Sequence, residues 1–296
     1  MAYGENPTVD AVAHGLHNRL EAHEIELRVI FADFRKPGWP GTANDAFRVG
    51  VSAGVDAVVV WLVTPGEPAE GVAEARSQGI PVITLERPRF SVDASVVWPN
   101  FNHGVYMAQH LATLLDPGAR VAVIGGPEVV DDTELVLGLV HGVTGAGLQL
   151  VNDPWLPQYR NITDVATGGK EAALSVLNDY PGLDGLIPFN DETMLGTVEA
   201  LRKVGRLGEP KMVSRNGSPW AVQAVLDGVT HGTWDIEPLR IGEMLADLVI
   251  RQLVHGRNLD GLCQSSPIGR MITPELAKSW VPWNERGAWG PLHEGL

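Results

Sequence analysis

The sequence predicts an α/β protein built as two doubly wound lobes, each with a parallel sheet. Helical and strand patterns alternate along most of its 296 residues. The strand-length apolar runs are unbroken, as in parallel sheets that are covered on both faces. A strand–helix–strand pattern also occurs twice. Because a chain of this length exceeds the usual size of a single core, two lobes account for it better than one.

Helices are predicted where apolar residues recur every three to four positions. In the first helix Val12, Leu16 and Leu20 follow this spacing, after the start signal Asn6-Pro7. The last predicted helix is long and precedes a tail rich in Gly and Pro. The predicted helices span residues 8–23, 43–53, 69–78, 103–115, 133–144, 163–177, 192–204, 219–226 and 239–255.

Strands are predicted where short apolar runs lie between turn signals, as in the Ala-Val-Val-Val-Trp-Leu run at residues 57–62. A Gly/Pro loop is expected at residues 37–41. The tail at 265–296 carries three tryptophans, Trp280, Trp283 and Trp289, and is expected to be irregular. The predicted strands span residues 25–31, 57–62, 82–85, 96–98, 120–124, 149–152, 186–189 and 211–214.

The internal repeat pairs residues 54–60 with residues 182–188. Each copy is followed by a helix and by a second strand that a proline opens. Pro81 lies 25 residues after Asp56, and Pro210 lies 26 residues after Asp184. Matching spacing favours two similar α/β halves, while chance similarity between short apolar strands is the alternative.

Composition excludes several classes of protein. The 36 acidic and 22 basic residues give a net charge of -14, which disfavours nucleic acid as a partner. One cysteine excludes an internal disulfide and a Cys-rich metal site. The longest apolar runs are too short to span a membrane. Met1 is followed by neither a basic cluster nor an apolar stretch, so the chain is cytoplasmic or an export signal has been removed.

Six phrases of the sequence occur in an order and spacing that resemble the periplasmic binding protein type I family. The resemblance is to its sugar-binding, ribose-binding-protein-like branch, and lactose-repressor-like effector domains share the fold. It extends from Asn6 to about Thr273. The phrases are Asn-Pro at 6–7, the strand at 54–60, Gly-Ile-Pro-Val-Ile-Thr-Leu-Glu-Arg at 79–87, Val-Ile-Gly-Gly-Pro at 123–127, Phe-Asn-Asp-Glu-Thr-Met-Leu-Gly at 189–196 and Asn-Gly-Ser-Pro at 216–219.

The resemblance implies discontinuous lobes joined by a hinge of three crossover strands. Lobe one would comprise residues 1–100 plus 237–264, lobe two residues 101–236, and the tail at 265–296 would pack across both. A ligand would lie in a cleft between the lobes, at the carboxyl ends of strands, and would stabilise the closed form. Only five residues precede Asn6, so the first strand of the family is expected to be missing.

Three positions match the sugar-binding pattern of the family. Glu86, Arg87 and Asn190 fall where the resemblance implies hydrogen bonds to sugar hydroxyls. Four positions depart from it, each with a loss of charge or hydrogen-bonding capacity. Because buried hydroxyls without partners are costly, the ligand is expected to be less polar than a free pentose or hexose. The departing residues are Trp61, Leu135, Asn216 and Ile236.

Nine tryptophans outnumber six phenylalanines, and several lie near the predicted cleft. We expect Trp61, Trp155 and Trp234 to stack on the ligand, although core packing is the general alternative for a tryptophan. Tyr159 follows Trp155 in the same loop and is also expected at the ligand. Arg215 and Asn216 would approach from lobe two. The acidic group Asp131, Asp132 and Glu134 is interpreted as a helix start that the helix dipole favours.

The leading hypothesis is a non-enzymatic solute-binding protein that delivers a sugar, polyol or glycoside-like ligand to the membrane permease of an ABC-type importer. We expect a monomer that is periplasmic or extracytoplasmic, without a cofactor, metal site or catalytic residue. One alternative is a cytoplasmic effector-sensing domain of regulator type without a DNA-binding head. Another is an enzyme on this fold with Glu86 as general acid or base, but no nucleophile or metal site pairs with Glu86.

Overall fold

The computed structural model describes residues 6–30, 41–63 and 68–287. The chain forms two compact units. Unit 1 comprises Met1–Trp98, Glu237–Pro267 and Trp283–Leu296, and unit 2 comprises Pro99–Ile236 and Ile268–Pro282. The chain therefore passes from one unit to the other four times, which makes both units discontinuous in sequence.

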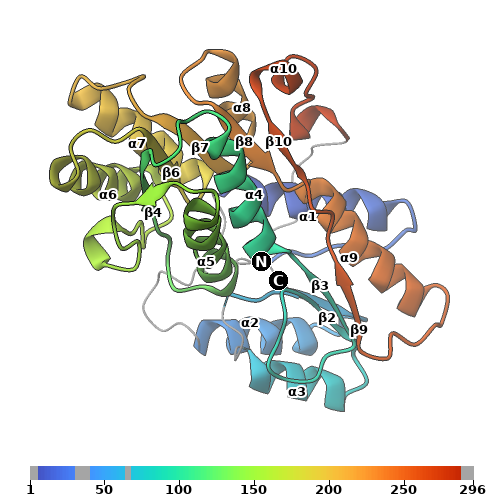
Figure 1. Cartoon of the computed structure of the whole chain (residues 1–296). Coiled ribbons are helices and arrows are strands. Elements are labelled where there is room, and N and C mark those ends of the chain that lie inside the picture. The colour runs from blue at the N-terminus through green and yellow to red at the C-terminus, as the bar shows by residue number, and fades with distance from the viewer. Residues whose placement is uncertain (1–5, 31–40, 64–67, 288–296) are drawn as a thin grey trace. The chain divides into compact units, whose positions relative to one another are not determined.

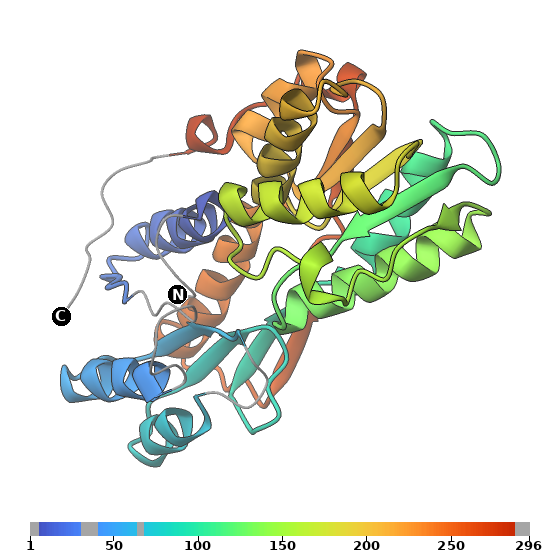
Figure 2. The same ribbon diagram turned by 90° about the vertical axis from the view of Figure 1, so that its left-hand side faces the viewer.

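Unit 1 contains a four-stranded parallel sheet in the order β1-β2-β3-β9. Helices α2 and α3 pack together on one face, and α9 contacts the other face beside α1. Both views show α1 (dark blue) running alongside α9 (orange-red) (Figures 1 and 2). The elements are α1 (Pro7–Glu21), α2 (Gly41–Ser52), β1 (Val58–Trp61), α3 (Ala69–Ser77), β2 (Val82–Leu85), β3 (Ala94–Val97), α9 (Pro238–Leu253), β9 (Leu262–Ser265) and the 3₁₀ turn η2 (Trp283–Glu285).

Unit 2 contains a six-stranded sheet in the order β10-β8-β7-β6-β4-β5, parallel except for the edge strand β10 (Figure 1). The described elements of this unit alternate strand and helix along most of its length. They are α4 (Asn100–Ala112), β4 (Arg120–Ile124), α5 (Val130–Gly145), β5 (Gln149–Leu150), the 3₁₀ turn η1 (Pro157–Tyr159), α6 (Ala166–Asp179), β6 (Gly185–Pro188), α7 (Asp191–Lys203), β7 (Lys211–Asn216), α8 (Pro219–Leu226), β8 (Gly232–Asp235), β10 (Arg270–Ile272) and α10 (Pro274–Ala277).

The sheet of unit 2 is apolar on both faces, which explains the unbroken apolar runs in the sequence. Ala122 and Leu186 pack in the cluster beneath α6 and α7. A side chain at Gly185 would instead meet Leu111 of α4, so α4 covers the opposite face. Helices α4 and α5 approach closely, since a Cβ atom at Gly138 would lie 2.0 Å from the Phe101 carbonyl oxygen.

The internal repeat is confirmed as a β-α-β unit in each half of the chain. The first repeated strand becomes β1, which pairs in parallel with β2 directly after Pro81. The second becomes β6, which pairs in parallel with β7 directly after Pro210. The predicted helices all form, with ends shifted by a few residues.

Two sequence predictions were wrong. Residues 25–30 form no regular strand and make only an isolated bridge at Val29, because an apolar run does not by itself supply a pairing partner. The tail is not wholly irregular, since β10 and α10 lie within it. The expected loop at 37–41 lies outside the described residues except for Gly41, which begins α2, and Trp289 also lies outside them.

A cavity of about 630 Å³ lies within unit 1 beside β1, the strand at which the sheet order ends. Its lining includes Leu16 of α1, Phe47 of α2, Val60 of β1 and Val249 of α9. The lining also includes charged residues, among them Glu24, Arg28 and Asp56, so the cavity is not lined by apolar residues alone. The expected absence of the first family strand remains a prediction, and so do the lobe boundaries.

Candidate functional site

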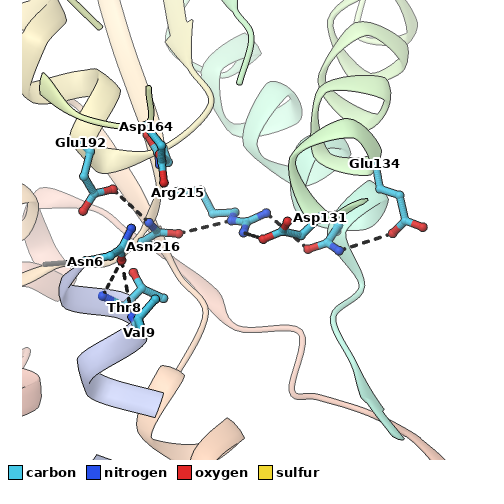
Figure 3. Close-up of polar contacts among 11 residues, drawn as sticks. Asn6, Thr8, Val9, Asp131, Glu134, Asp164, Glu192, Arg215 and Asn216 are labelled. Atoms are coloured by element: carbon cyan, nitrogen blue, oxygen red, sulfur yellow. Dashed lines mark hydrogen bonds and ion pairs between the residues drawn. The ribbon is translucent and has the colours of Figure 1, made fainter. Parts of the chain in front are cut away.

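In unit 2, polar side chains gather where β6 and β7 end and where α5 and α7 begin. Asn190 directly follows β6 and caps α7, and Arg215 and Asn216 are the last residues of β7. Because the carboxyl ends of parallel strands meet at one sheet edge, this is the edge where α/β proteins bind ligands. Arg215 is hydrogen-bonded to Asn216, which in turn donates to Glu192 (Figure 3), and Asn190 is bonded separately to Asp164.

Arg215 is the centre of the network and is only 3% exposed. Its Nη2 lies 3.6 Å from Asp131 Oδ2, its Nη1 donates to Asn100 Oδ1 at 3.3 Å, and its Nε donates to Asn216 Oδ1 at 3.4 Å. Asn100 Nδ2 in turn donates to Glu134 Oε2 at 3.4 Å. The guanidinium thus links α4, α5 and β7 through one ion pair and two hydrogen bonds (Figure 3).

Asn216 connects a further carboxylate to this centre, and Asn190 holds another carboxylate at the end of β6. Asn216 Nδ2 donates to Glu192 Oε2 at 3.3 Å, and Asn190 Nδ2 donates to Asp164 Oδ1 at 2.5 Å. Asn190 Oδ1 accepts from the Thr193 backbone N–H at 3.0 Å, which is the helix cap. Asn216 has a φ of 130°, in a region that non-glycine residues rarely adopt. The backbone at the end of β7 is therefore held in a strained conformation beside the polar groups.

Burial and mutual repulsion raise the pKa values of the carboxyl groups here. Burial raises the pKa of Asp131 even though Arg215 opposes it. Burial and then the charges of Asp131 and Asp164 raise the pKa of Asp132 well above its usual value. Burial and then Asp164 raise the pKa of Glu192 in the same way. These carboxyl groups therefore release their protons less readily than ordinary Asp and Glu side chains do.

Asp191 adjoins the site but has a structural role. Its carboxylate accepts hydrogen bonds from the hydroxyls of Ser214, Ser218 and Thr233 and from the Ser218 backbone N–H. Burial raises its pKa to about 6, and these four donors limit the rise. Both carboxylate oxygens are thus occupied in joining β7, the start of α8 and β8.

Trp234 lies next to Arg215 in the parallel register of β7 and β8. Its ring stacks on Tyr106, with 5.7 Å between centroids, and its Nε1 donates to the Ile268 carbonyl at 2.8 Å. Burial and the nearby Arg215 charge lower the pKa of His103 to about 3, so this imidazole is neutral. Trp234 is thus near the network, although its indole N–H is already engaged.

The predicted residues of unit 1 lie at the ends of β1 and β2. Glu86 follows β2, is buried and has a φ of 77°, while Arg87 is exposed. The Thr84 hydroxyl donates to the Glu86 carbonyl at 2.9 Å. Trp61 ends β1, is half-buried and meets Trp98 edge to face at 4.9 Å between ring centroids. These residues share one sheet edge of unit 1.

The structure does not bring two predicted residues to the network. The Tyr159 ring is 4% exposed within the apolar cluster of unit 2, and its hydroxyl donates to Asp179 Oδ2 at 2.8 Å. Tyr159 therefore packs as a core residue. Trp155 is half-buried in the loop before it, where its backbone N–H donates to Asp153. No described contact joins Trp155 to Arg215.

The sequence reasoning did not assign six residues of this region to the site: Asn100, Asp131, Asp132, Glu134, Asp164 and Glu192. Asp131 and Asp132 do lie in the first turn of α5, as interpreted, but both are buried rather than solvated. A signal was available, because acidic residues directly after the Gly125-Gly126 turn of a strand end lie at the ligand edge of the sheet. Asp164 and Asn100 carry no comparable local signal.

Among the described residues, no group of three or more His, Cys, Asp or Glu side chains is placed to hold a metal ion. None of the helices in those residues is long and apolar enough to cross a membrane.

Comparison with known proteins gives consistent matches. A ribose import binding protein of Bacillus subtilis is 24% identical over 256 residues, covering 86% of this chain and 80% of that protein. A xylitol-binding protein of Mycolicibacterium smegmatis is 28% identical over 195 residues, covering 62% of this chain and 52% of that protein.

A solved structure shows the same α/β fold. It is an ABC transporter periplasmic solute binding protein from Actinobacillus succinogenes with bound D-allose, at a TM-score of 0.83 and 19% identity over 93% of this chain and 96% of that chain. Residues 4–258 match the family described as the periplasmic binding protein domain. Since this match spans most of the chain, the protein belongs to the periplasmic binding protein domain family and is a binding protein, not an enzyme.

Proposed function

We propose that this chain is the solute-binding protein of an ABC-type importer and that its ligand is a small carbohydrate-like molecule. The observation that carries the proposal is the gathering of Asn190, Arg215 and Asn216 at the carboxyl ends of β6 and β7. These side chains present both hydrogen-bond donors and hydrogen-bond acceptors, which polyhydroxylated ligands require. Family membership makes this edge the expected binding edge.

The relatives support a ligand of the sugar or polyol class. Their names assign ribose import and xylitol binding to them, and the solved relative holds D-allose. We extend the class, though not the individual ligand, to this chain. An extracytoplasmic location, a permease partner and a monomeric state are parts of the same proposal.

The residues of unit 1 belong to the proposal as a second set. Glu86 would accept hydrogen bonds and Arg87 would donate them, while Trp61 offers an apolar face to a ring. Participation of both sets in one ligand complex, with lobe closure, is a prediction from the sequence. A ligand less polar than a free pentose or hexose is a further prediction. It rests on the positions, such as Trp61, where the sequence lacks the polar side chain of the family pattern.

A panel of pentoses, hexoses, polyols and glycosides, read by thermal shift and then by calorimetry, tests the function. A ligand of this class should raise the melting temperature and bind with one-to-one stoichiometry. Glu86→Gln and Asn190→Ala should each weaken binding of that same ligand. The loss should be about ten-fold or more for Glu86→Gln, which removes a charge-assisted hydrogen bond, and smaller for Asn190→Ala, whose amide is neutral. Glu199→Gln is the matched control, because Glu199 is exposed on α7 and pairs with Lys170. A folded protein that responds to no member of the panel would refute the function.

A further inference from the structure

We propose that a short segment near the end of the chain is a strap that limits how far unit 1 and unit 2 can move apart. The strap is residues 280–283, which contain the fourth crossing of the chain between the units, directly after Pro282. Trp280 holds the strap to unit 2, and Trp283 holds it to unit 1. The proposal goes beyond ligand binding, because it concerns how the relative motion of the two units is restricted.

The first anchor lies in unit 2. Trp280 Nε1 donates to Asp235 Oδ2 at 2.8 Å, and Asp235 is the fully buried last residue of β8. The indole ring also packs against an apolar cluster that includes Val225 of α8 and Ile272 of β10. Breaking this contact would deprive a buried carboxylate of a donor, which is costly. Trp280 is therefore attached to unit 2 by a hydrogen bond and by packing.

The chain that leads to Trp280 is fixed along the same strand. β10 pairs with β8 in antiparallel register, and Trp234 Nε1 of β8 donates to the Ile268 carbonyl at 2.8 Å. The chain leaves unit 2 after Ile236, the residue that follows β8, and re-enters it at Ile268. Three of the four crossings are therefore tied to the end of β8 in unit 2, the last of them through Trp280.

The second anchor lies in unit 1. Trp283 is 1% exposed and is one of the largest fully buried side chains among the described residues. It begins η2, in which the Arg286 backbone N–H donates to the Trp283 carbonyl at 3.0 Å. A Cβ atom at Gly287 would lie 3.1 Å from Asn18 Nδ2, so this end of the tail lies against α1. Burial of a whole indole ring removes a large apolar area from water, which makes Trp283 a firm anchor.

The strap between the anchors is short. Only Val281 and Pro282 separate the two tryptophans. Three Cα–Cα steps of about 3.8 Å allow the Cα atoms of Trp280 and Trp283 to lie about 11 Å apart at most. The proline ring fixes its own φ and restricts the residue before it. Any motion that moves these points further apart requires one tryptophan to leave its site. The strap should therefore remove such conformations from the ensemble of the free protein.

Lengthening the strap while leaving both anchors in place tests the proposal. A flexible insertion of about six Gly and Ser residues is placed between Val281 and Pro282. The control carries the same insertion between Leu207 and Gly208, in an exposed loop where the chain stays within unit 2.

The readout is a distance between the units in the protein without ligand. One spin label is attached to Cys263, the exposed single cysteine of the chain, which lies in unit 1. The other is attached to Glu171→Cys, at an exposed position of α6 in unit 2. Double electron–electron resonance then gives the distribution of distances between the two labels.

We expect the strap insertion to broaden this distribution toward longer distances and the control insertion to leave it unchanged. Trp280→Phe keeps the ring but loses the N–H donor to Asp235, so it should give a smaller change in the same direction. In the proposed function, a longer strap adds conformations to the free protein but not to the ligand complex. Ligand affinity should then fall by up to about eight-fold, because the entropy of a loop grows with the 3/2 power of its length.

Two results would overturn the strap. One is a distribution that the strap insertion leaves unchanged in a protein that melts like its parent, which would show that the tail only packs on the surface. The other is an equal broadening by the control insertion, since added length alone would then be the cause. Both measurements are made without ligand, so they remain decisive if no member of the panel binds and the solute-binding function fails.

Discussion

The guanidinium Nη2 of Arg215 lies 3.6 Å from Oδ2 of Asp131, and this pair links the end of β7 to the start of α5 inside unit 2. Arg215 is the cation that opposes the repulsion acting on Asp132. Replacement by an apolar side chain of similar length would leave the carboxylates without it. Several properties of the protein should depend on this pair.

Arg215→Met should lower the free energy of unfolding by about 3 kcal/mol or more, the usual cost of removing one partner of a buried ion pair. The loss should be smaller in acid, where protonated carboxyls no longer need the cation. Urea unfolding of both proteins at acidic and neutral pH measures the difference. An equal loss at both pH values would show that the guanidinium acts by packing alone.

The free protein should lose stability as the pH rises through the acidic range. Burial raises the folded-state pKa of Asp191 to about 6, and burial and repulsion raise those of Asp132 and Glu192. Between its usual pKa and the raised one, each group keeps in the folded state a proton that the unfolded chain has released. The extra stability is therefore present below the usual pKa and lost above the raised one.

Thermal melts across that range measure the decline. Asp132→Asn and Glu192→Gln should each flatten the profile, because the titrating group is gone. Stability that rises with pH through the same window would contradict the assigned direction.

Asp191→Ala should lower the free energy of unfolding by about 3 kcal/mol, because it leaves four buried donors without their acceptor. Chemical denaturation measures the loss. Asp227→Ala serves as the control, since Asp227 is exposed at the end of α8 and accepts one hydrogen bond from Gln223. Similar losses in both variants would mean that the four contacts to Asp191 contribute nothing special.

Tyr159→Phe distinguishes the sequence prediction from the structure. The sequence placed Tyr159 at the ligand, whereas its hydroxyl donates to Asp179 and its ring lies in the apolar cluster. The variant should lose a little stability and keep its ligand affinity. Calorimetry with the best ligand of the panel decides, and a clear drop in affinity would support the sequence prediction instead.

Gly50→Ala should stabilise unit 1 by about 0.5–1 kcal/mol through helix propensity. Gly50 lies in α2, lines the cavity beside β1, and has open space where a Cβ atom would be. Gly142→Ala should instead destabilise the protein, because its Cβ atom would lie 2.7 Å from that of Ala108. Melting temperatures that move in the same direction would show that local space is not the deciding factor.

Local patterns in the sequence determined most of the fold. Unbroken apolar runs such as Val82–Leu85 predicted strands that are buried on both faces, and the proline spacing of the repeat predicted two β-α-β units. The strand prediction for residues 25–30 was wrong because a strand also needs a neighbouring strand to pair with. Such a partner comes from a distant part of the chain, which a local pattern does not reveal. The antiparallel edge strand β10 was missed for the same reason.

The site residues likewise fall into those that the sequence predicted and those that only the structure revealed. Asn190, Arg215 and Asn216 could be selected from the sequence because strand ends in this fold meet at one edge. Asp132 and Glu192 look like ordinary acidic residues of a helix start. Only the tertiary structure brings them from α5 and α7 to Asp164 and Arg215, and only burial raises their pKa values. Sequence fixes which groups are present, while folding sets the distances and the dielectric that give those groups their chemistry.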